Sequence, residues 1–371
     1  MRKNLICLVL IFLSFQFNQK EMNAQGPLKA PPLGGSQKAQ IIQYIGVTEI
    51  SIRYHRPGVR GRNGKIWGKL VPWGFTTAPF DTKLIPWRAG ANETTIISFS
   101  DDVTVEGKNL PAAAYGLFMA VWPDSCILIF SKISRSWGSF AYNDKDDVLR
   151  VVVKPAKLEK SEEWLKYDFL NPSENSVTVA LSWEKLMIPF RVETDLQKNV
   201  IKSFRQQLKM PQMASNPAAW QQAAAYCSEN KMNLEEALIW SDSAIAHIPA
   251  GKRNFGIMAT KANVLSRLGR INEADAIVKD AMPVAEIYEL YNYGMSLLEA
   301  NRKEKAFEIF EFAYKQVGDD DWLACVGLGE GYFALNNPAK ALEYAEKALK
   351  ASPDGNKQLA ENLIKKITNK K

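Results

Sequence analysis

Histidine is nearly missing from this sequence. The 371 residues contain only His55 and His247, which stand far apart in the chain. Zinc motifs such as HExxH need two histidines one helical turn apart, so no such motif can form here. A catalytic triad built on histidine would have to use one of these two residues. The sequence therefore predicts no metal site and no bound cofactor.

Cysteine is also scarce, with four residues and no CxxC pair. Cys7 lies in a segment that we expect to be removed, which leaves Cys126, Cys227 and Cys325. Secreted domains that depend on disulfides are much richer in cysteine. We therefore predict no structural disulfide, while a single pair among the three stays open.

Long apolar runs are absent after the first residues. The run from Leu5 to Phe17 follows Arg2 and Lys3 and precedes Ala24, a small residue suited to cleavage. A membrane-spanning helix needs about 20 apolar residues, and this run is shorter. We predict that residues 1–24 are a secretory signal peptide, that the mature protein is periplasmic or otherwise secreted, and that it has no stable membrane insertion. An uncleaved membrane anchor is the alternative.

The charge balance is mildly basic. Loss of Arg2, Lys3, Lys20 and Glu21 with the signal peptide lowers the net charge from +7 to +5. Spread over the remaining chain, this charge is too dilute for a nucleic-acid-binding surface. We therefore predict no nucleic-acid partner.

The composition changes near residue 197. Residues 25–195 are rich in tryptophan and proline, and apolar residues alternate with polar ones in about eight to ten short runs. In one of them Ile50, Ile52 and Tyr54 share a face, as in a half-buried strand. Such strands with no helices between them favour an antiparallel sandwich or barrel. We predict an all-β antiparallel sandwich or barrel module over residues 25–195.

Small residues recur with a regular period in the alanine-rich second half. Ala225, Ala262, Gly294 and Gly329 follow one another at steps of 37, 32 and 35 positions, and each precedes an alanine by twelve positions. This spacing resembles that of tetratricopeptide repeats, whose paired helices approach closely at small residues. We predict a linker helix over 196–216 and an all-α tetratricopeptide-like helical solenoid over 217–371. The resemblance implies a protein partner in the groove of the repeats.

The segment that follows Tyr54 has an unusual charge. No acid occurs from Ile50 to Phe80, while six cations do, among them Arg56, Arg60 and Arg62. Guanidinium groups bind carboxylate, sulfate and phosphate groups in a bidentate manner. We therefore predict that these three arginines bind a small anionic ligand. The alternative is that they pair with acids elsewhere in the domain or face solvent.

The same part of the chain resembles a family of secreted bacterial proteins, the domain of unknown function 2911. The resemblance is carried mainly by residues 54–57, 66–74, 87–95 and 183–184. It covers about residues 35–195 and implies a secreted all-β module that helical repeats often follow, with no known activity. Residues Phe75 to Pro86 look like an insertion relative to the family, and such an insertion can reshape or cover the site.

Residues 87–95 contain further candidates for a site. Arg88, Asn92 and Glu93 present a cation, an amide and a carboxylate at the start of a strand, which suits a polar ligand or one acid–base step. Alternatively, Arg88 and Glu93 form a buried ion pair that fixes the loop to the sheet. His55 is a second candidate base.

Three tryptophans, Trp67, Trp73 and Trp87, surround the basic segment. Aromatic faces beside polar groups are common in ligand pockets, so Trp87 is a further candidate contact for a sugar-like ligand. Packing in the core is the alternative.

Two functions are compatible with these patterns. The first is binding and scaffolding: the β-module holds a small anionic or sugar-like ligand, and the repeats hold a protein. The ligand-binding residues would then be Arg56, Arg60, Arg62, Arg88, Asn92 and Trp87. The second is a cell-envelope hydrolase or lyase with Glu93 and His55 as catalytic residues. The sequence favours the first function, and it identifies no substrate, partner or oligomeric state.

Overall fold

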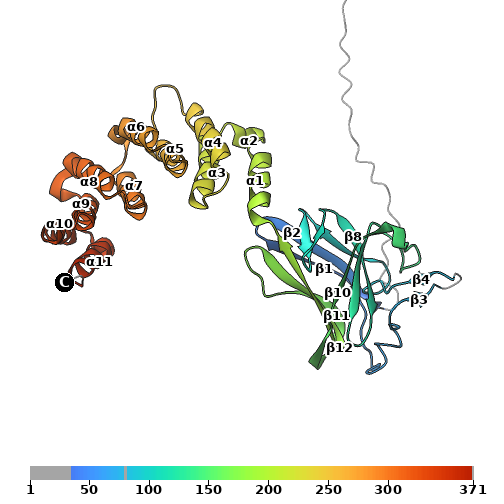
Figure 1. Ribbon diagram of the computed structural model, residues 1–371. Coiled ribbons are helices and arrows are strands. Elements are labelled where there is room, and N and C mark those ends of the chain that lie inside the picture. Colours follow the sequence, from blue (N-terminus) through green and yellow to red (C-terminus); the bar gives the residue numbers. More distant parts are fainter. Residues whose placement is uncertain (1–34, 79–81, 370–371) are drawn as a thin grey trace, which may run out of the picture. The chain divides into compact units, whose positions relative to one another are not determined.

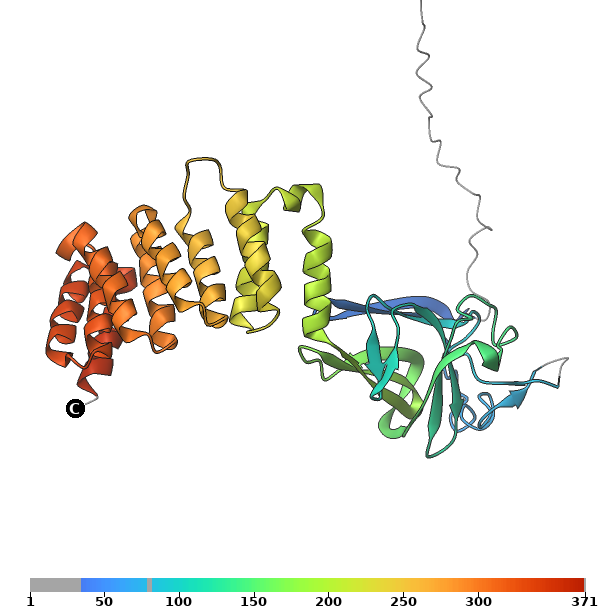
Figure 2. The same cartoon turned by 45° about the horizontal axis from the view of Figure 1, so that its top comes forward.

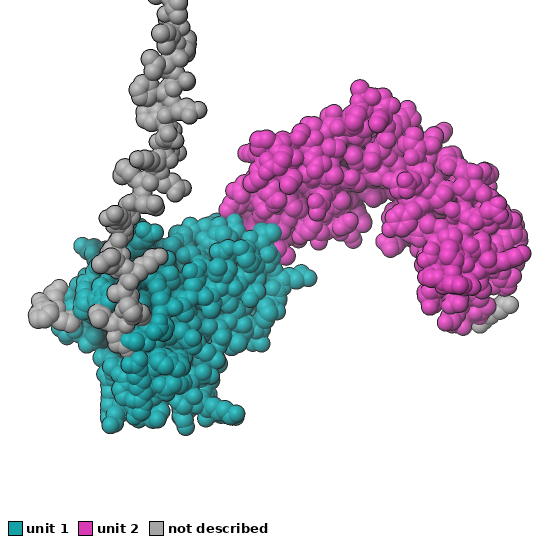
Figure 3. Space-filling model, turned by 180° about the vertical axis from the view of Figure 1, so that it is seen from behind, with its two compact units in different colours: residues 1–194 teal, residues 195–371 magenta. Residues whose placement is uncertain are grey.

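A computed structural model describes residues 35–78 and 82–369, and the chain divides into two compact units between Thr194 and Asp195 (Figure 3). The signal peptide expected over residues 1–24 lies outside the described residues. No helix among the described residues is long and apolar enough to cross a membrane.

The first unit contains a six-stranded antiparallel sheet in the order β1-β2-β5-β8-β9-β10 (Figure 1). Its strands are β1 (Gln37–Ile45), β2 (Thr48–Arg56), β5 (Thr95–Phe99), β8 (Ala114–Val121), β9 (Cys126–Ser131) and β10 (Asp147–Val153). The alternation expected in β2 is confirmed, because Ile50, Ile52 and Tyr54 are buried while Arg53 between them is exposed. The sheet therefore has one face in the core.

A second, four-stranded sheet has the order β11-β12-β6-β7. It is formed by β6 (Val103–Val105), β7 (Lys108–Leu110), β11 (Ala156–Leu170) and β12 (Ser176–Thr194). One apolar cluster takes residues from both sheets, from Ile52 and Leu117 in the first to Leu181 and Trp183 in the second. The two sheets thus enclose a common core, and the predicted all-β antiparallel sandwich is confirmed.

A small hairpin of β3 (Thr76–Thr77) and β4 (Leu84–Ile85) forms a separate two-stranded sheet. It lies within the segment that was expected to be an insertion, Phe75 to Pro86. The hairpin matters for the site, because residues of both its strands line the cleft described below.

The described residues of the second unit form helices joined by loops (Figure 2). Its helices are α1 (Leu196–Gln207), α2 (Pro211–Ala214), α3 (Pro217–Glu229), α4 (Leu234–Ala246), α5 (Phe255–Arg267), α6 (Ile271–Ala281), α7 (Ile287–Glu299), α8 (Lys303–Val317), α9 (Trp322–Ala334), α10 (Pro338–Ala351) and α11 (Lys357–Thr368). Helices α3 to α10 form four consecutive pairs, and the predicted helical repeat array is confirmed. The segment expected as a linker helix contains α1 and α2, and Ile201 of α1 shares an apolar cluster with Ala224 and Trp240.

Small residues lie where paired helices approach one another. Ala262, Ala274 and Ala306 are fully buried, and a Cβ added to Gly294 of α7 would lie 2.3 Å from the Phe310 ring of α8. The expectation for Ala225 in the first pair is wrong, because Ala224 is the fully buried residue there and Ala225 is only half-buried.

Candidate functional site

The main cleft of the first unit has a volume of about 700 Å³. Three chain segments form its walls: the loop after β2, the chain from β4 to β5, and the loop after β9. Trp183 of β12 and Ser36 complete it. Five of the predicted ligand-binding residues line this cleft, namely Arg60, Arg62, Trp87, Arg88 and Asn92.

Among the described residues that line the cleft, the charged side chains are all arginines and none is an acid. Arg62 is partly engaged by the protein, since its guanidinium donates to the Val59 and Gly58 carbonyls at 3.0 and 2.7 Å. Arg60 is exposed and lies over the Trp164 ring, 5.7 Å from its centroid. These two side chains therefore add positive charge without offering a fully free guanidinium.

Arg88 is different, because it is half-buried and none of the described residues forms an ion pair with it. Its Nε is buried and has no hydrogen-bond partner within residues 35–78 and 82–369. Burial lowers the pKa of Arg88, as expected for a cation taken out of water with no acid beside it. No described side chain therefore compensates the positive charge of Arg88 in the cleft.

The alternative that Arg88 and Glu93 form a buried ion pair is wrong. Glu93 is about half exposed, and its carboxylate accepts a hydrogen bond of 2.6 Å from Lys38 of β1. This hydrogen bond lowers the pKa of Glu93. The sequence could not reveal the pair, because Lys38 reaches Glu93 only once β1 lies beside β2.

Glu93 lies at a second, smaller hollow of about 350 Å³ rather than at the main cleft. Arg53, Arg135 and Trp137 also line this hollow. His55 is buried beside it, with its Nε2 3.6 Å from the Glu93 carboxylate. The two candidate catalytic residues therefore lie close together, but neither is among the residues that line the main cleft.

His55 is tied to the main cleft through its other nitrogen. Its Nδ1 lies 3.1 Å from the Ser36 carbonyl and 3.2 Å from the Asn92 amide nitrogen. A given tautomer can satisfy only one of these contacts, since Nδ1 donates to a carbonyl but accepts from an amide. Asn92 itself has a left-handed backbone, with φ of 56°, which asparagine tolerates better than most residues.

Arg56 is the one predicted ligand-binding residue that does not line the cleft. Its Nε donates to the Leu165 carbonyl of β11 at 3.0 Å. The side chain thus joins the two sheets. The sequence left open that these arginines pair with acids elsewhere in the domain. Arg56 does bind another part of the domain, but its partner is a main-chain oxygen.

The tryptophans near the cleft pack against one another. Trp87 and Trp183 are stacked with centroids 6.3 Å apart, and Trp67 meets both edge-on. The Trp87 indole N–H donates to the Gly90 carbonyl at 3.1 Å. Trp87 therefore packs against the core and also lines the cleft.

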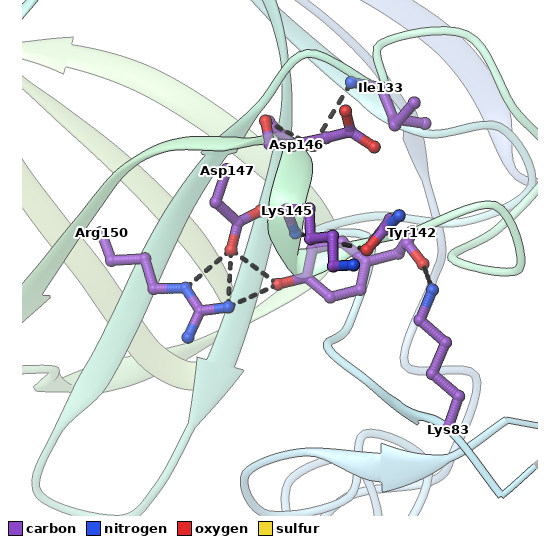
Figure 4. A network of polar contacts seen from close by, with 9 residues as sticks. Lys83, Ile133, Tyr142, Lys145, Asp146, Asp147 and Arg150 are labelled. Carbon is purple, nitrogen blue, oxygen red and sulfur yellow. Dashed lines mark hydrogen bonds and ion pairs between the residues drawn. The ribbon is translucent and has the colours of Figure 1, made fainter.

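A polar network supports the wall beside the hairpin (Figure 4). The Tyr142 hydroxyl donates to Asp147 at 2.8 Å, and the Arg150 Nε donates to the same carboxylate oxygen at 2.7 Å. Lys83, which precedes β4, donates to the main-chain carbonyl of Tyr142. Burial raises the pKa of Asp147, against the opposing effect of Tyr142 and Arg150.

Several lining residues were not among the sequence candidates. Ser36, Ser139, Phe140 and Trp183 come from parts of the chain remote from the basic segment. Trp183 carried a signal, since it belongs to a motif of the resemblance. The other three have side chains that are ordinary in loops, so only the fold brings them to the cleft.

Comparison with known proteins supports both parts of the chain. The model of a family described as "Protein of unknown function (DUF2911)" matches residues 36–192, and a tetratricopeptide repeat model matches residues 322–354. Both resemblances are thereby confirmed. Tetratricopeptide arrays are protein–protein interaction scaffolds, and the helical repeats of the second unit are similar to this class. No curated protein matches the chain.

Solved structures give distant likenesses. YrrB, described as a tetratricopeptide protein with an unusual peptide-binding site, is 21% identical, with 44% of this chain and 81% of that chain covered and a TM-score of 0.29. Pseudomonas aeruginosa pilF is 22% identical over 42% of this chain and 68% of that chain, with a TM-score of 0.31. A tetratricopeptide protein from Parabacteroides merdae is 18% identical over 46% and 61%, with a TM-score of 0.30.

Proposed function

We propose that the first unit binds a small anionic ligand in the main cleft, with Arg88 as its anchor, while the helical repeats hold a protein partner. The observation that carries the first part is the buried Nε of Arg88, which has no hydrogen-bond partner among the residues that the structure describes, in a cleft whose described lining contains no acid. A cation in such surroundings gains much from an anion, because hydrogen bonds between charged groups are the strong ones.

The rest of the cleft suits the same ligand. Arg60 and Arg62 raise the positive potential, and the Asn92 amide and the Ser36 and Ser139 hydroxyls are polar groups that can fix orientation. The volume is in the usual range for sites of small organic ligands, roughly 300–1,000 Å³.

A hydrolase or lyase using Glu93 and His55 receives less support. An acid–base group must come within hydrogen-bond reach of the proton that it moves. Neither residue is among those lining the cleft that holds Arg88, and Glu93 already accepts a hydrogen bond from Lys38. Binding is therefore the better proposal for the β-module.

The repeats offer a shallow groove of about 260 Å³ between α5 and α7. Its lining includes the amide side chains of Asn263 and Asn292 beside Tyr293. Amides can donate to and accept from an extended peptide backbone at once, so we propose this groove as the contact with the protein partner. We also propose that both units act outside the cytoplasm, after removal of residues 1–24.

Calorimetric titration of the full chain with acetate, phosphate and sulfate tests the anchor. We expect Arg88→Gln to weaken binding of the preferred anion roughly 10- to 100-fold, because a charged hydrogen bond is lost. Arg53→Gln, at the second hollow, is the matched control and should leave affinity unchanged. Equal affinities of both variants and the natural chain would disprove the proposed site.

A further inference from the structure

The main cleft has an apolar side that a simple anion would leave uncovered. Leu70 and Phe140 both line it, and their side chains are 48% and 56% exposed. Val71, Ile85 and Pro57 continue this apolar lining inward. Large exposed apolar side chains gathered at a concave site indicate that an apolar group covers them in the bound state.

Two further exposed apolar side chains belong to the same chain segments. Trp73, on the loop that bears Leu70, and Leu84 of β4 are also exposed. Both segments contribute lining residues to the cleft. Some of the exposed apolar side chains of the first unit therefore belong to the chain segments that form the cleft.

The charge and the apolar surface are adjacent. A Cβ built on Gly138 would lie 3.0 Å from Nη1 of Arg88 and 3.5 Å from the Phe140 ring. The guanidinium nitrogen and the ring are thus no more than 6.5 Å apart, the sum of these two distances. One ligand can contact both, with an anionic head group at Arg88 and an apolar body over Phe140.

The polar groups of the cleft argue against a sugar. A sugar presents many hydroxyls that both donate and accept. The side chains of the described lining that can accept from them are only one amide and three hydroxyls, those of Asn92, Ser36, Thr76 and Ser139. The Trp87 ring is stacked on Trp183 and met edge-on by Trp67, so it is already used in packing. An apolar group needs no hydrogen-bond partners from the lining residues.

We propose that the occupant is an amphiphilic anion, in which a single carboxylate or comparable head group is attached to an aliphatic or aromatic body. This inference rests on the proposed function, since it assumes an anion at Arg88. It goes further in assigning the apolar side of the cleft to the same ligand.

A series of straight-chain carboxylates, acetate, butanoate, hexanoate and octanoate, tests the inference by calorimetry on the full chain. Affinity should rise roughly two- to fourfold with each added methylene, the effect of partial to full burial of such a group. 1-Octanol, which has the chain without the charge, should bind at least tenfold more weakly than octanoate.

Two variants locate the two ends of the ligand. Phe140→Ser changes an exposed side chain, so the fold should be kept, and it should weaken octanoate several-fold while leaving acetate unchanged. Arg88→Gln should weaken both carboxylates, and Arg53→Gln should weaken neither.

The outcomes separate the inference from the function on which it rests. Carboxylates that bind through Arg88 with no gain from chain length would disprove the amphiphile and keep the anion site. If neither Arg88→Gln nor Phe140→Ser changes the affinity for octanoate, octanoate binds elsewhere and the inference is contradicted. No binding of any carboxylate, phosphate or sulfate would overturn both.

Discussion

The contribution of Arg88 to stability distinguishes a binding role from a structural role for this residue. Loss of one partner of a buried ion pair costs about 3–5 kcal/mol of stability, whereas no acid among the described residues pairs with Arg88. We expect Arg88→Gln to change the unfolding free energy by less than about 1 kcal/mol, or a midpoint shift under about 4 °C. Thermal unfolding followed by near-ultraviolet circular dichroism measures this. A fall of 6 °C or more would show that Arg88 holds the fold together.

The Lys38–Glu93 pair should make stability depend on pH. The hydrogen bond from Lys38 lowers the pKa of Glu93 in the folded chain. A lowered pKa means that the pair stabilises the fold above the pKa of an ordinary glutamate, near 4.3, and that this effect is lost as the pH falls through the folded value. Because both side chains are about half exposed, the effect is small.

Lys38→Met is the corresponding test. The variant should be slightly less stable than the natural chain at pH 7, and the two urea-unfolding midpoints should converge as the pH falls from about 4 towards 2. A stability difference that stays constant over this range would assign it to packing of Lys38 instead.

Tyr142 connects the hairpin wall to the sheet. Its buried hydroxyl donates to Asp147 and accepts from Arg150 at 2.9 Å. Tyr142→Phe leaves Asp147 with one donor fewer and should cost about 1–2 kcal/mol, or roughly 3–6 °C. Tyr44→Phe is the control, since Tyr44 is exposed and its hydroxyl donates to the Glu49 carboxylate in an exposed hydrogen bond. Equal losses in the two variants would contradict the role of the network.

For single residues, the sequence predicted which charged side chains line the cleft better than it predicted which residues bond to one another. The acid-free run of cations pointed to Arg60 and Arg62, which line the cleft, and to Arg56, which does not. The motif pointed to Arg88 and Asn92, which both line it. The partner of Glu93 was not predictable, because Lys38 and Glu93 are distant in the chain and meet only through strand pairing. Whether the arginines bind a ligand stays a prediction.

Among the elements, strands were predictable where one face is buried and the other is not. β11 shows the limit: its sequence AKLEKSEEWLKYDFL is highly charged, and most of its first ten residues are exposed. It is a strand because it pairs with the long β12 at the edge of the second sheet, from Ala156 opposite Met187 to Leu170 opposite Thr178. Pairing with a distant strand is hard to predict from the order of apolar and polar residues within the segment itself.

In the first helix pair, the repeat period does not predict the buried small residue correctly. Residues 230–233 connect α3 to α4, whereas three residues connect α5 to α6, α7 to α8 and α9 to α10. The extra residue moves the buried small position of α3 from Ala225 back to Ala224. A period measured on the other pairs therefore misplaces this contact by one residue.

Gly294 tests the close approach of α7 and α8. Its added Cβ would lie 2.3 Å from the Phe310 ring, so Gly294→Ala should force a shift and cost about 1–3 kcal/mol. Gly256 of α5 is the control, because its nearest neighbour would be the flexible end of Glu289 at 3.3 Å. Gly256→Ala should be neutral or slightly stabilising, since glycine is a poor helix former. Thermal melts followed at 222 nm distinguish the two, and equal melts would contradict the packing.

At the scale of the whole molecule, the two units have separate apolar cores. The clusters around Trp183 in the first unit and around Leu290 and Phe310 in the second contain no residue of the other unit. Each repeat contacts mainly its neighbours, so a fragment of residues 195–371 should fold alone. Its circular dichroism should show mostly helix and a cooperative melt. A random-coil spectrum would show that the repeats need the β-module.

The claim that the main cleft holds an anion beside Arg88 is tested most directly by crystals of the full chain soaked in selenate, whose selenium gives an anomalous signal. The account predicts an anomalous peak in the cleft within hydrogen-bond reach of the Arg88 guanidinium, and its loss in Arg88→Gln crystals soaked identically. Peaks at other surface cations with none in the cleft would contradict it.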